Sequence, residues 1–419
     1  MSSRAFTLLF VFFLAAMLLV RIWLAIRHIR HVRRHSDRVP EQFAERIPLS
    51  AHRKAADYTI EKTRFGLVEL LVNIAVLLCF TLFGGLQWLS ELILDLTGSG
   101  MTQQIGLLAA FAVLSGIIDL PFEYYRLFVL EEKFGFNKIT PRLFILDLVK
   151  GCVLGIVLGL PLAWVTLALM ETAGNLWWLY AWAFWSVFQL SMLVLYPSVI
   201  APLFNKFTPL ADEELRARIE NLMKRVGFAA KGLFVMDGSK RSAHGNAYFT
   251  GFGKAKRIVF FDTLITSLAP AEIEAVLAHE LGHFKLKHVV KRMVLSFALS
   301  LGFLWLLGFL KGQPWFYAGL GVDPAIGIAN NALALLLFML ALPVFTFLLS
   351  PLMSISSRKH EFEADAFAAQ YADAHALASA LVKMYEDNAS TLTPDPLHSA
   401  FYDSHPPAAV RTGRLLGTA

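Results

Sequence analysis

Residues 275–288 read AVLAHELGHFKLKH and place two histidines, His279 and His283, four positions apart. On an α-helix these positions differ by about 400° of rotation, so both imidazoles project from nearly the same face, one turn apart. Two imidazoles in this arrangement can share one tetrahedral metal ion, with Glu280 beside an open coordination position, where it can take a proton from water. The pattern indicates a catalytic zinc site, although two ordinary surface histidines would give the same spacing.

Long apolar runs flank this motif on both sides along the chain. The protein has 419 residues, of which 56% are hydrophobic and 17% charged, a balance typical of lipid-embedded proteins. Runs of about 20 residues, long enough to cross a bilayer, lie near residues 5–27, 66–89, 103–124, 144–170, 176–200, 289–310 and 327–350. The sequence therefore predicts a mainly α, polytopic membrane protein with about seven transmembrane helices. The first run ends in a dense basic cluster, which favours a retained span over a cleaved signal peptide.

The distribution of basic residues predicts which side of the membrane each loop faces. Lys and Arg are frequent in residues 27–64, after the first run, and absent from residues 90–101, after the second. Cytoplasmic loops carry an excess of Lys and Arg, so alternation along the chain places residues 201–288 and 351–419 together on the cytoplasmic side. The net charge of +6 fits a membrane surface, and no nucleic-acid-binding motif accompanies it.

The second hydrophilic stretch offers the third ligand that a catalytic zinc needs. Residues 354–373 read SISSRKHEFEADAFAAQYAD, with Glu361 and Asp365 again four positions apart. Glu361 is predicted to bind the metal, and Asp365 to accept the free N–H of a zinc histidine and so fix its tautomer. A surface ion pair between Glu361 and Arg358, three positions earlier, is the alternative.

Three further ionisable residues close to these motifs are predicted to lie elsewhere. His360 and Glu363 flank Glu361 but point to other sides of a helix, so solvated positions are expected for both. His288 follows His283 by five residues, which on a continuous helix turns it about 140° from the ligand face. We therefore expect His288 to lie at the membrane interface.

The hydrophilic stretches are expected to fold into one zincin-like domain with a small β hairpin. Residues 212–228 have the pattern of an amphipathic helix, residues 232–238 that of a strand, residues 246–265 that of a hairpin around a Gly-rich turn, and residues 269–288 that of the motif helix. The predicted layout is 1–200 for transmembrane helices one to five, 201–288 for the first part of the catalytic domain, 289–350 for helices six and seven, and 351–419 for the second part.

Six separated stretches together resemble the CAAX prenyl protease 1 family, integral-membrane zinc endopeptidases that in eukaryotes remove the last three residues of a prenylated C-terminus. They are LPFEYYRLFVLEEKFGFNKITPRLFILDLVK (120–150), PLFNKFTPL (202–210), SKRSAHGNAYFTGFGKAKRIVFFDTLI (239–265), AVLAHELGHFKLKHVVK (275–291), SRKHEFEADAFA (357–368) and SAFYDSHPPAAVRTGRL (399–415). These stretches extend over most of the chain and are jointly far more specific than one HExxH motif.

The resemblance implies a site and an architecture. It makes His279, His283 and Glu361 the ligands of one Zn²⁺ ion per chain and Glu280 the base. Asp365 is then the residue that accepts a hydrogen bond from a zinc-binding histidine. It also implies seven helices around a large intramembrane chamber that the zinc domain caps.

Two further elements are candidates for contact with the substrate. The tail resembles the late His-Pro segment of the family, so His405 and Arg411 are expected to donate to the oxyanion or the substrate carbonyl; a helix-start histidine and a surface arginine are the alternative. The strand around Asn246, Ala247 and Tyr248 is expected to hold an extended peptide by edge pairing. A buried hairpin strand with no free edge would fit the same sequence.

The predicted activity is hydrolysis of peptide bonds in peptide or protein substrates, prenylated or not, at a lipid bilayer. A heat-shock-type metallopeptidase for membrane-protein quality control is the alternative enzyme, although such enzymes would have fewer spans and an earlier motif. A non-enzymatic transporter or scaffold is the alternative of another class. The absence of a dibasic retrieval signal in TGRLLGTA favours a bacterial inner membrane over the endoplasmic reticulum.

Overall fold

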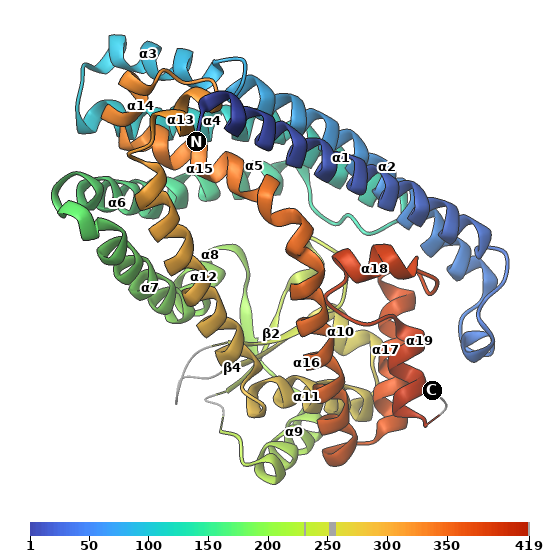
Figure 1. Cartoon of the computed structure of the whole chain (residues 1–419). Helices are drawn as coiled ribbons and strands as arrows, with labels where there is room; N and C mark the ends of the chain where they lie inside the picture. The colour runs from blue at the N-terminus through green and yellow to red at the C-terminus, as the bar shows by residue number, and fades with distance from the viewer. Residues whose placement is uncertain (230–231, 251–256, 418–419) are drawn as a thin grey trace.

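The computed structural model describes residues 1–229, 232–250 and 257–417. Within these residues seven helical segments are long and apolar enough to cross a membrane, which confirms the predicted polytopic, mainly α architecture (Figure 1). The segments are Ser3–Arg34, Leu49–Phe80, Met101–Glu131, Pro141–Thr172, Gly174–Phe204, His288–Leu310 and Asn331–Tyr371.

The membrane half contains most of the helices. They are α1 (Ser3–Arg34), α2 (Leu49–Phe80), α3 (Gly85–Thr97), α4 (Met101–Tyr125), α5 (Pro141–Leu154), α6 (Leu160–Thr172), α7 (Trp177–Leu195), α8 (Ala201–Phe204), α12 (His288–Leu310), α13 (Pro314–Gly319), α14 (Pro324–Ala329) and α15 (Asn331–Thr346). Three π-helical turns continue α4, α5 and α7, namely η2 (Arg126–Glu131), η3 (Gly155–Gly159) and η5 (Tyr196–Ile200).

The second half carries the strands and the remaining helices. The helices are α9 (Glu213–Val226), α10 (Asp262–Ser267), α11 (Pro270–Lys285), α16 (Ser350–Tyr371), α17 (Ala374–Asp387), α18 (Pro396–Tyr402) and α19 (Ala408–Leu415). The strands are β1 (Phe207–Pro209), β2 (Gly232–Met236), β3 (Ala247–Thr250) and β4 (Arg257–Phe261). Each element that the sequence predicted for residues 212–288 is present, but the end of the predicted hairpin, residues 262–265, is wrong, because these residues begin helix α10. The hairpin turn, residues 251–256, lies outside the described residues.

Two helices extend beyond the apolar run that marks them. The second span, predicted for residues 66–89, begins at Leu49 and ends at Phe80. The chain turns before Gly84, whose φ of +74° suits glycine. The predicted limits are wrong because apolar composition marks the part of a helix that faces lipid, whereas turns set its ends. At the last span, α16 begins at Ser350, where the apolar run was expected to stop, and continues to Tyr371.

The membrane helices are held together at one end and separated at the other. A cluster of buried apolar residues joins α1, α3, α4, α6, α7 and α12 to α13–α15, with Phe10, Leu107, Leu167, Tyr317 and Leu337 fully buried or nearly so. In four spans only 6% of the most apolar window is buried within the protein. Lipid on the outside is what such exposed apolar surface requires.

Two cavities lie where the helices separate. One, of about 860 Å³, lies between α1, α2, the loop before β3 and the α17–α18 region, and both Lys62 and His405 line it. The other, of about 670 Å³, is lined by Glu69, Asp119 and Arg126 from α2, α4 and η2. Charged side chains within apolar spans are tolerated where they face a water-filled space, and Lys62, Glu69 and Arg126 all line these cavities.

The sheet has the strand order β1-β2-β4-β3, with β2 and β4 parallel and the other pairs antiparallel. Its apolar face packs with α9 and α11 over a core that includes Ile219, Phe260 and Leu277. Since β3 pairs only with β4 among the described strands, its other edge is free of a strand partner. β3 is therefore an edge strand of the sheet.

The two parts of the predicted catalytic domain, residues 201–288 and 351–419, meet where α11 packs along α16 (Figure 1). Gly282 lies at this contact, where a Cβ atom would come 3.1 Å from Ala364 Cα and 3.2 Å from Ala364 O. A larger residue would push the helices apart. The absence of a side chain at Gly282 therefore lets segments far apart in the chain approach closely.

Candidate metal centre

Helix α11 presents His279 and His283 toward α16. Its first turn is fixed by Pro270 at the N-terminus and by the Glu272 carboxylate, which accepts a hydrogen bond from the Ala269 N–H at 2.8 Å. The rest of the helix is buried on several sides, and His279 and His283 are only 6% and 9% exposed. The helix therefore holds both imidazoles rigidly inside the domain.

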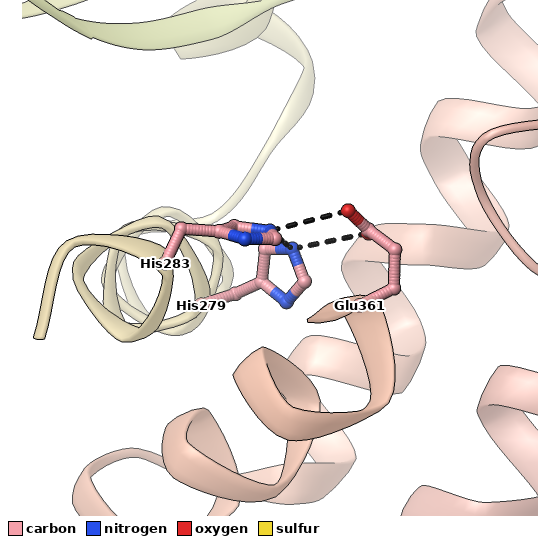
Figure 2. A group of neighbouring side chains, drawn as sticks. All are labelled: His279, His283 and Glu361. Atoms are coloured by element: carbon pink, nitrogen blue, oxygen red, sulfur yellow. Dashed lines mark hydrogen bonds and ion pairs between the residues drawn. The ribbon is translucent and has the colours of Figure 1, made fainter. Parts of the chain in front are cut away.

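Helix α16 places the Glu361 carboxylate against both rings (Figure 2). His279 Nε2 and His283 Nε2 lie 3.2 Å apart. Glu361 Oε2 is 3.5 Å from His279 Nε2, and Oε1 is 3.2 Å from His283 Nε2. The structure thus brings together the three residues that the sequence proposed as ligands, from helices α11 and α16.

This arrangement fits a zinc ion. Tetrahedral ligands at bond lengths of about 2.0–2.1 Å lie roughly 3.3 Å from one another, which matches all three separations. Glu361 Oε2 is buried and, among the described residues, has no hydrogen-bond partner, although His405 Nδ1 lies 2.7 Å away. A buried carboxylate oxygen without an aligned donor is costly, and a cation at the centre would compensate it.

His279 is supported from behind by a buried ion pair. Its Nδ1 lies 2.8 Å from Asp365 Oδ1, and Arg411 from α19 donates to both oxygens of Asp365, at 2.8 and 2.6 Å. Burial lowers the pKa of His279, but hydrogen bonds to Asp365 and Glu361 raise it to about 9. The surroundings of this imidazole therefore favour a positive charge, whether a proton or a metal ion.

His283 has a different outer partner, which the sequence interpretation placed elsewhere. Its Nδ1 lies 3.0 Å from Nδ1 of His288, and Nε2 of His288 lies 2.9 Å from Glu363 Oε2. His288 is the first residue of the candidate span His288–Leu310 and is completely buried, so the predicted position away from the ligand face is wrong.

The cause of this error is a break in the helix. α11 ends at Lys285, and Lys287 has the left-handed φ of +57° before α12 begins at His288. A helical extrapolation across residues 286–287 is therefore invalid, because the turn folds His288 back onto His283. His360 and Glu363 are partly exposed, in line with the solvated positions predicted for them, but both also pack against His288, which was not predicted. A lysine at a left-handed position is uncommon, so residues 286–287 carry little signal of the turn.

Two further residues of the motif helices have other surroundings. Arg358 donates to backbone carbonyls of Ser399 and Asp403, so it does not pair with Glu361, as the surface alternative required. Glu280 is half-buried on α11 and has no hydrogen-bond or ion-pair partner among the described residues.

The two tail residues differ in accessibility. The His405 side chain is 61% exposed, with Nδ1 against Glu361, and it lines the 860 Å³ cavity. Arg411 is 5% exposed and uses its donors on Asp365. Burial alone would lower the pKa of Arg411, but the ion pairs with Asp365 and Glu361 raise it, so the guanidinium stays charged.

The strand predicted to bind peptide borders the same cavity. Asn246 is exposed and lines the cavity together with His405, and Ala247 and Tyr248 pair with Phe260 and Val259 of β4. Strand β3 also contacts α11. Among the described strands, none pairs with the outer edge of β3, as edge pairing with a peptide requires.

Comparisons with known proteins agree with this arrangement. Residues 28–206 match the family described as CAAX prenyl protease N-terminal, five membrane helices, and residues 209–419 match peptidase family M48. Among curated relatives, the CAAX prenyl protease 1 homolog of Arabidopsis thaliana is 38% identical over 90% of both chains. CAAX prenyl protease 1 of Saccharomyces cerevisiae is 36% identical, over 90% of this chain and 88% of its own.

A solved structure has the same fold. The crystal structure of Ste24p from S. mikatae superposes with a TM-score of 0.90 at 33% identity, covering 98% of this chain and 99% of that one. Its fold, the matched M48 family and the relatives favour a membrane metallopeptidase over a non-enzymatic scaffold and over the smaller heat-shock-type enzymes. The chain belongs to the CAAX prenyl protease 1 family of M48 metallopeptidases.

Proposed function

We propose that this protein is a zinc endopeptidase that cleaves peptide bonds close to the C-terminus of prenylated proteins, as the names of its relatives suggest. The observation that carries the proposal is the triangle of His279 Nε2, His283 Nε2 and the Glu361 carboxylate, with sides of 3.2 to 3.5 Å. Two imidazoles and one carboxylate form a ligand set of catalytic zinc in peptidases.

Each neighbouring side chain has a proposed part in hydrolysis. Zinc, when bound, supplies a Lewis acid for the scissile carbonyl and makes water more acidic. Glu280 takes a proton from the attacking water and delivers it to the leaving amine. Asp365 holds His279 in the tautomer that leaves Nε2 free to bind.

The tail is proposed to contribute one donor to the reaction and one support. His405 is exposed to the cavity, and its Nδ1 faces the acceptor Glu361 Oε2. When the ring carries both protons, its Nε2 can donate to the developing oxyanion of the substrate. Arg411 is buried against Asp365, and we assign it the role of holding that carboxylate in place. Its guanidinium then acts on catalysis through Asp365 and His279.

The substrate peptide is proposed to lie along β3. Main-chain groups on the free edge of β3 would pair with an extended substrate, and Asn246 marks the point where this edge meets the cavity. The cavity continues from His405 to Lys62 on α2 and Arg21 on α1. A lipidated C-terminal segment would thus enter between the membrane helices and reach the zinc ligands from the membrane side.

We also propose that the metal centre faces the cytoplasm. The basic residues between α1 and α2 support this orientation, because cytoplasmic loops are enriched in Lys and Arg. Glycosylation sites introduced into the loops at either end of the helices would test it. Modification of the loop at residues 35–48 would contradict the proposal, whereas modification of the loop at residues 98–100 would support it.

Cleavage of a farnesylated CAAX peptide and its unprenylated twin tests the proposed function. We expect release of the C-terminal tripeptide from the farnesylated peptide, and loss of that activity in Glu280→Gln with zinc retained. Glu274→Gln is the matched control, because Glu274 lies on the same helix but pairs with Arg218 and Arg225. Equal cleavage of both peptides would indicate a general peptidase. Full activity in Glu280→Gln would remove Glu280 from its proposed role.

A further inference from the structure

A second cluster of metal-binding side chains lies beside the catalytic one. It consists of His288 at the start of α12 and of His360 and Glu363 on α16, which offer one ligand atom each within 4.8 Å of one another. Nε2 of His288 is 2.9 Å from Glu363 Oε2, and the rings of His288 and His360 stack with centroids 4.1 Å apart. Two imidazoles and one carboxylate repeat the donor set of the catalytic site.

His360 has a ring nitrogen that could bind a cation. Its Nδ1 is buried and, among the described residues, has no hydrogen-bond partner, which is an unfavourable state for a ring nitrogen. The stacked rings are inclined by only 16°, so their lone pairs run nearly parallel. Rotation of the His360 side chain would direct one of its ring nitrogens toward His288 Nε2 and Glu363 Oε2, which already form a pair.

We propose that His288, His360 and Glu363 form a second site for a zinc-class divalent cation, and that its occupation weakens zinc binding at the catalytic site. Imidazole and carboxylate donors suit Zn²⁺ and similar ions. Lys291, Arg292 and Lys359 lie close enough to act on this cluster electrostatically. Their positive charge makes the second site the weaker of the two.

The coupling follows from the proton positions on two histidines. When His283 binds through Nε2, its Nδ1 carries the proton and donates to Nδ1 of His288, which is 3.0 Å away. Nε2 of His288 then carries a proton and donates to Glu363. A cation on Nε2 of His288 moves the proton of that neutral ring to Nδ1, where two N–H groups would face each other. His288 therefore cannot serve both ions equally well.

Zinc stoichiometry of the full-length protein in detergent tests the site without reference to activity. In equilibrium dialysis against rising Zn²⁺, we expect one tightly bound ion and a second, weaker one per chain. His360→Phe keeps an aromatic ring on His288 but removes the nitrogens, so it should bind only the first ion. His375→Ala, at an exposed histidine of α17, is the control that should still bind two. A single ion in the wild type, or two in His360→Phe, would overturn the site.

The regulatory part rests on the proposed function and has its own measurement. With isotopically labelled zinc bound at the catalytic site, excess unlabelled Zn²⁺ should speed release of the label from the wild type, and release from His360→Phe at the same concentration should be at least about tenfold slower. Occupation of the second site without faster release of the label would overturn the coupling. If neither peptide is cleaved but dialysis shows the second ion, the proposed function fails while the site stands.

Discussion

The two histidines of α11 face the same carboxylate but have different surroundings. Behind His279 lies a charged pair, Asp365 and Arg411, contributed by α16 and α19. Behind His283 lies a second imidazole, His288, contributed by the turn into α12 and held by Glu363. A carboxylate increases the basicity of its imidazole partner more than a neutral ring does. The comparison indicates that the two ligands depend unequally on their outer partners.

Removing the shared ligand should have the largest effect, since it affects both surroundings. Glu361→Gln keeps the shape of the side chain but replaces an anionic ligand with an amide that binds zinc poorly. We expect the tightly bound zinc to be lost and peptide cleavage to fall to background. Metal analysis of the purified variant checks the first expectation. An active variant that retains its zinc would contradict the assignment of Glu361.

Asp365→Asn should weaken the His279 side of the site. The amide offers His279 a poorer acceptor and leaves Arg411 as a buried cation without its carboxylate. We expect zinc affinity to fall by about 10–100-fold and the thermal midpoint to drop as well. Competition with a zinc chelator measures the affinity. Glu214→Gln, at an exposed position of α9, controls for the loss of one negative charge, and an equal effect there would refute the specific role.

Gly282→Ala should disturb the surroundings of both histidine ligands, because it would separate α11 from α16. The added methyl group would meet backbone atoms of Ala364 at 3.1–3.2 Å, a clash for which overpacked cores lose about 1–3 kcal/mol. We expect a lower thermal midpoint and weaker zinc binding. An unchanged midpoint would mean that the helix contact is more adaptable than its geometry indicates.

His288→Leu should have the smallest effect, confined to the His283 side. Leucine fills much of the buried space but cannot accept the proton of His283, and we expect zinc affinity to fall by about tenfold. His288→Gln restores an acceptor and should recover most of that affinity, as measured by chelator competition. A loss in His288→Leu that matches Asp365→Asn would show that the two surroundings contribute equally.

The sequence predicted those parts of the site that follow regular helical spacing. His279 with His283, and Glu361 with Asp365, each lie four residues apart on helices that the structure confirms. The structure added His288, which meets His283 only because the chain turns at Lys287, and Glu363, which pairs with His288. Their roles, like those of the predicted ligands, stay predictions until the variants are measured.

By itself, the sequence determined the seven apolar spans and the helical faces of the motifs, because hydrophobicity and the helical repeat are local properties. Tertiary structure decided which distant groups meet. The close contact at Gly282, the free edge of β3 and the turn that brings His288 behind His283 depend on how helices and strands pack. Such packing follows from the whole chain, and no short stretch of residues contains it.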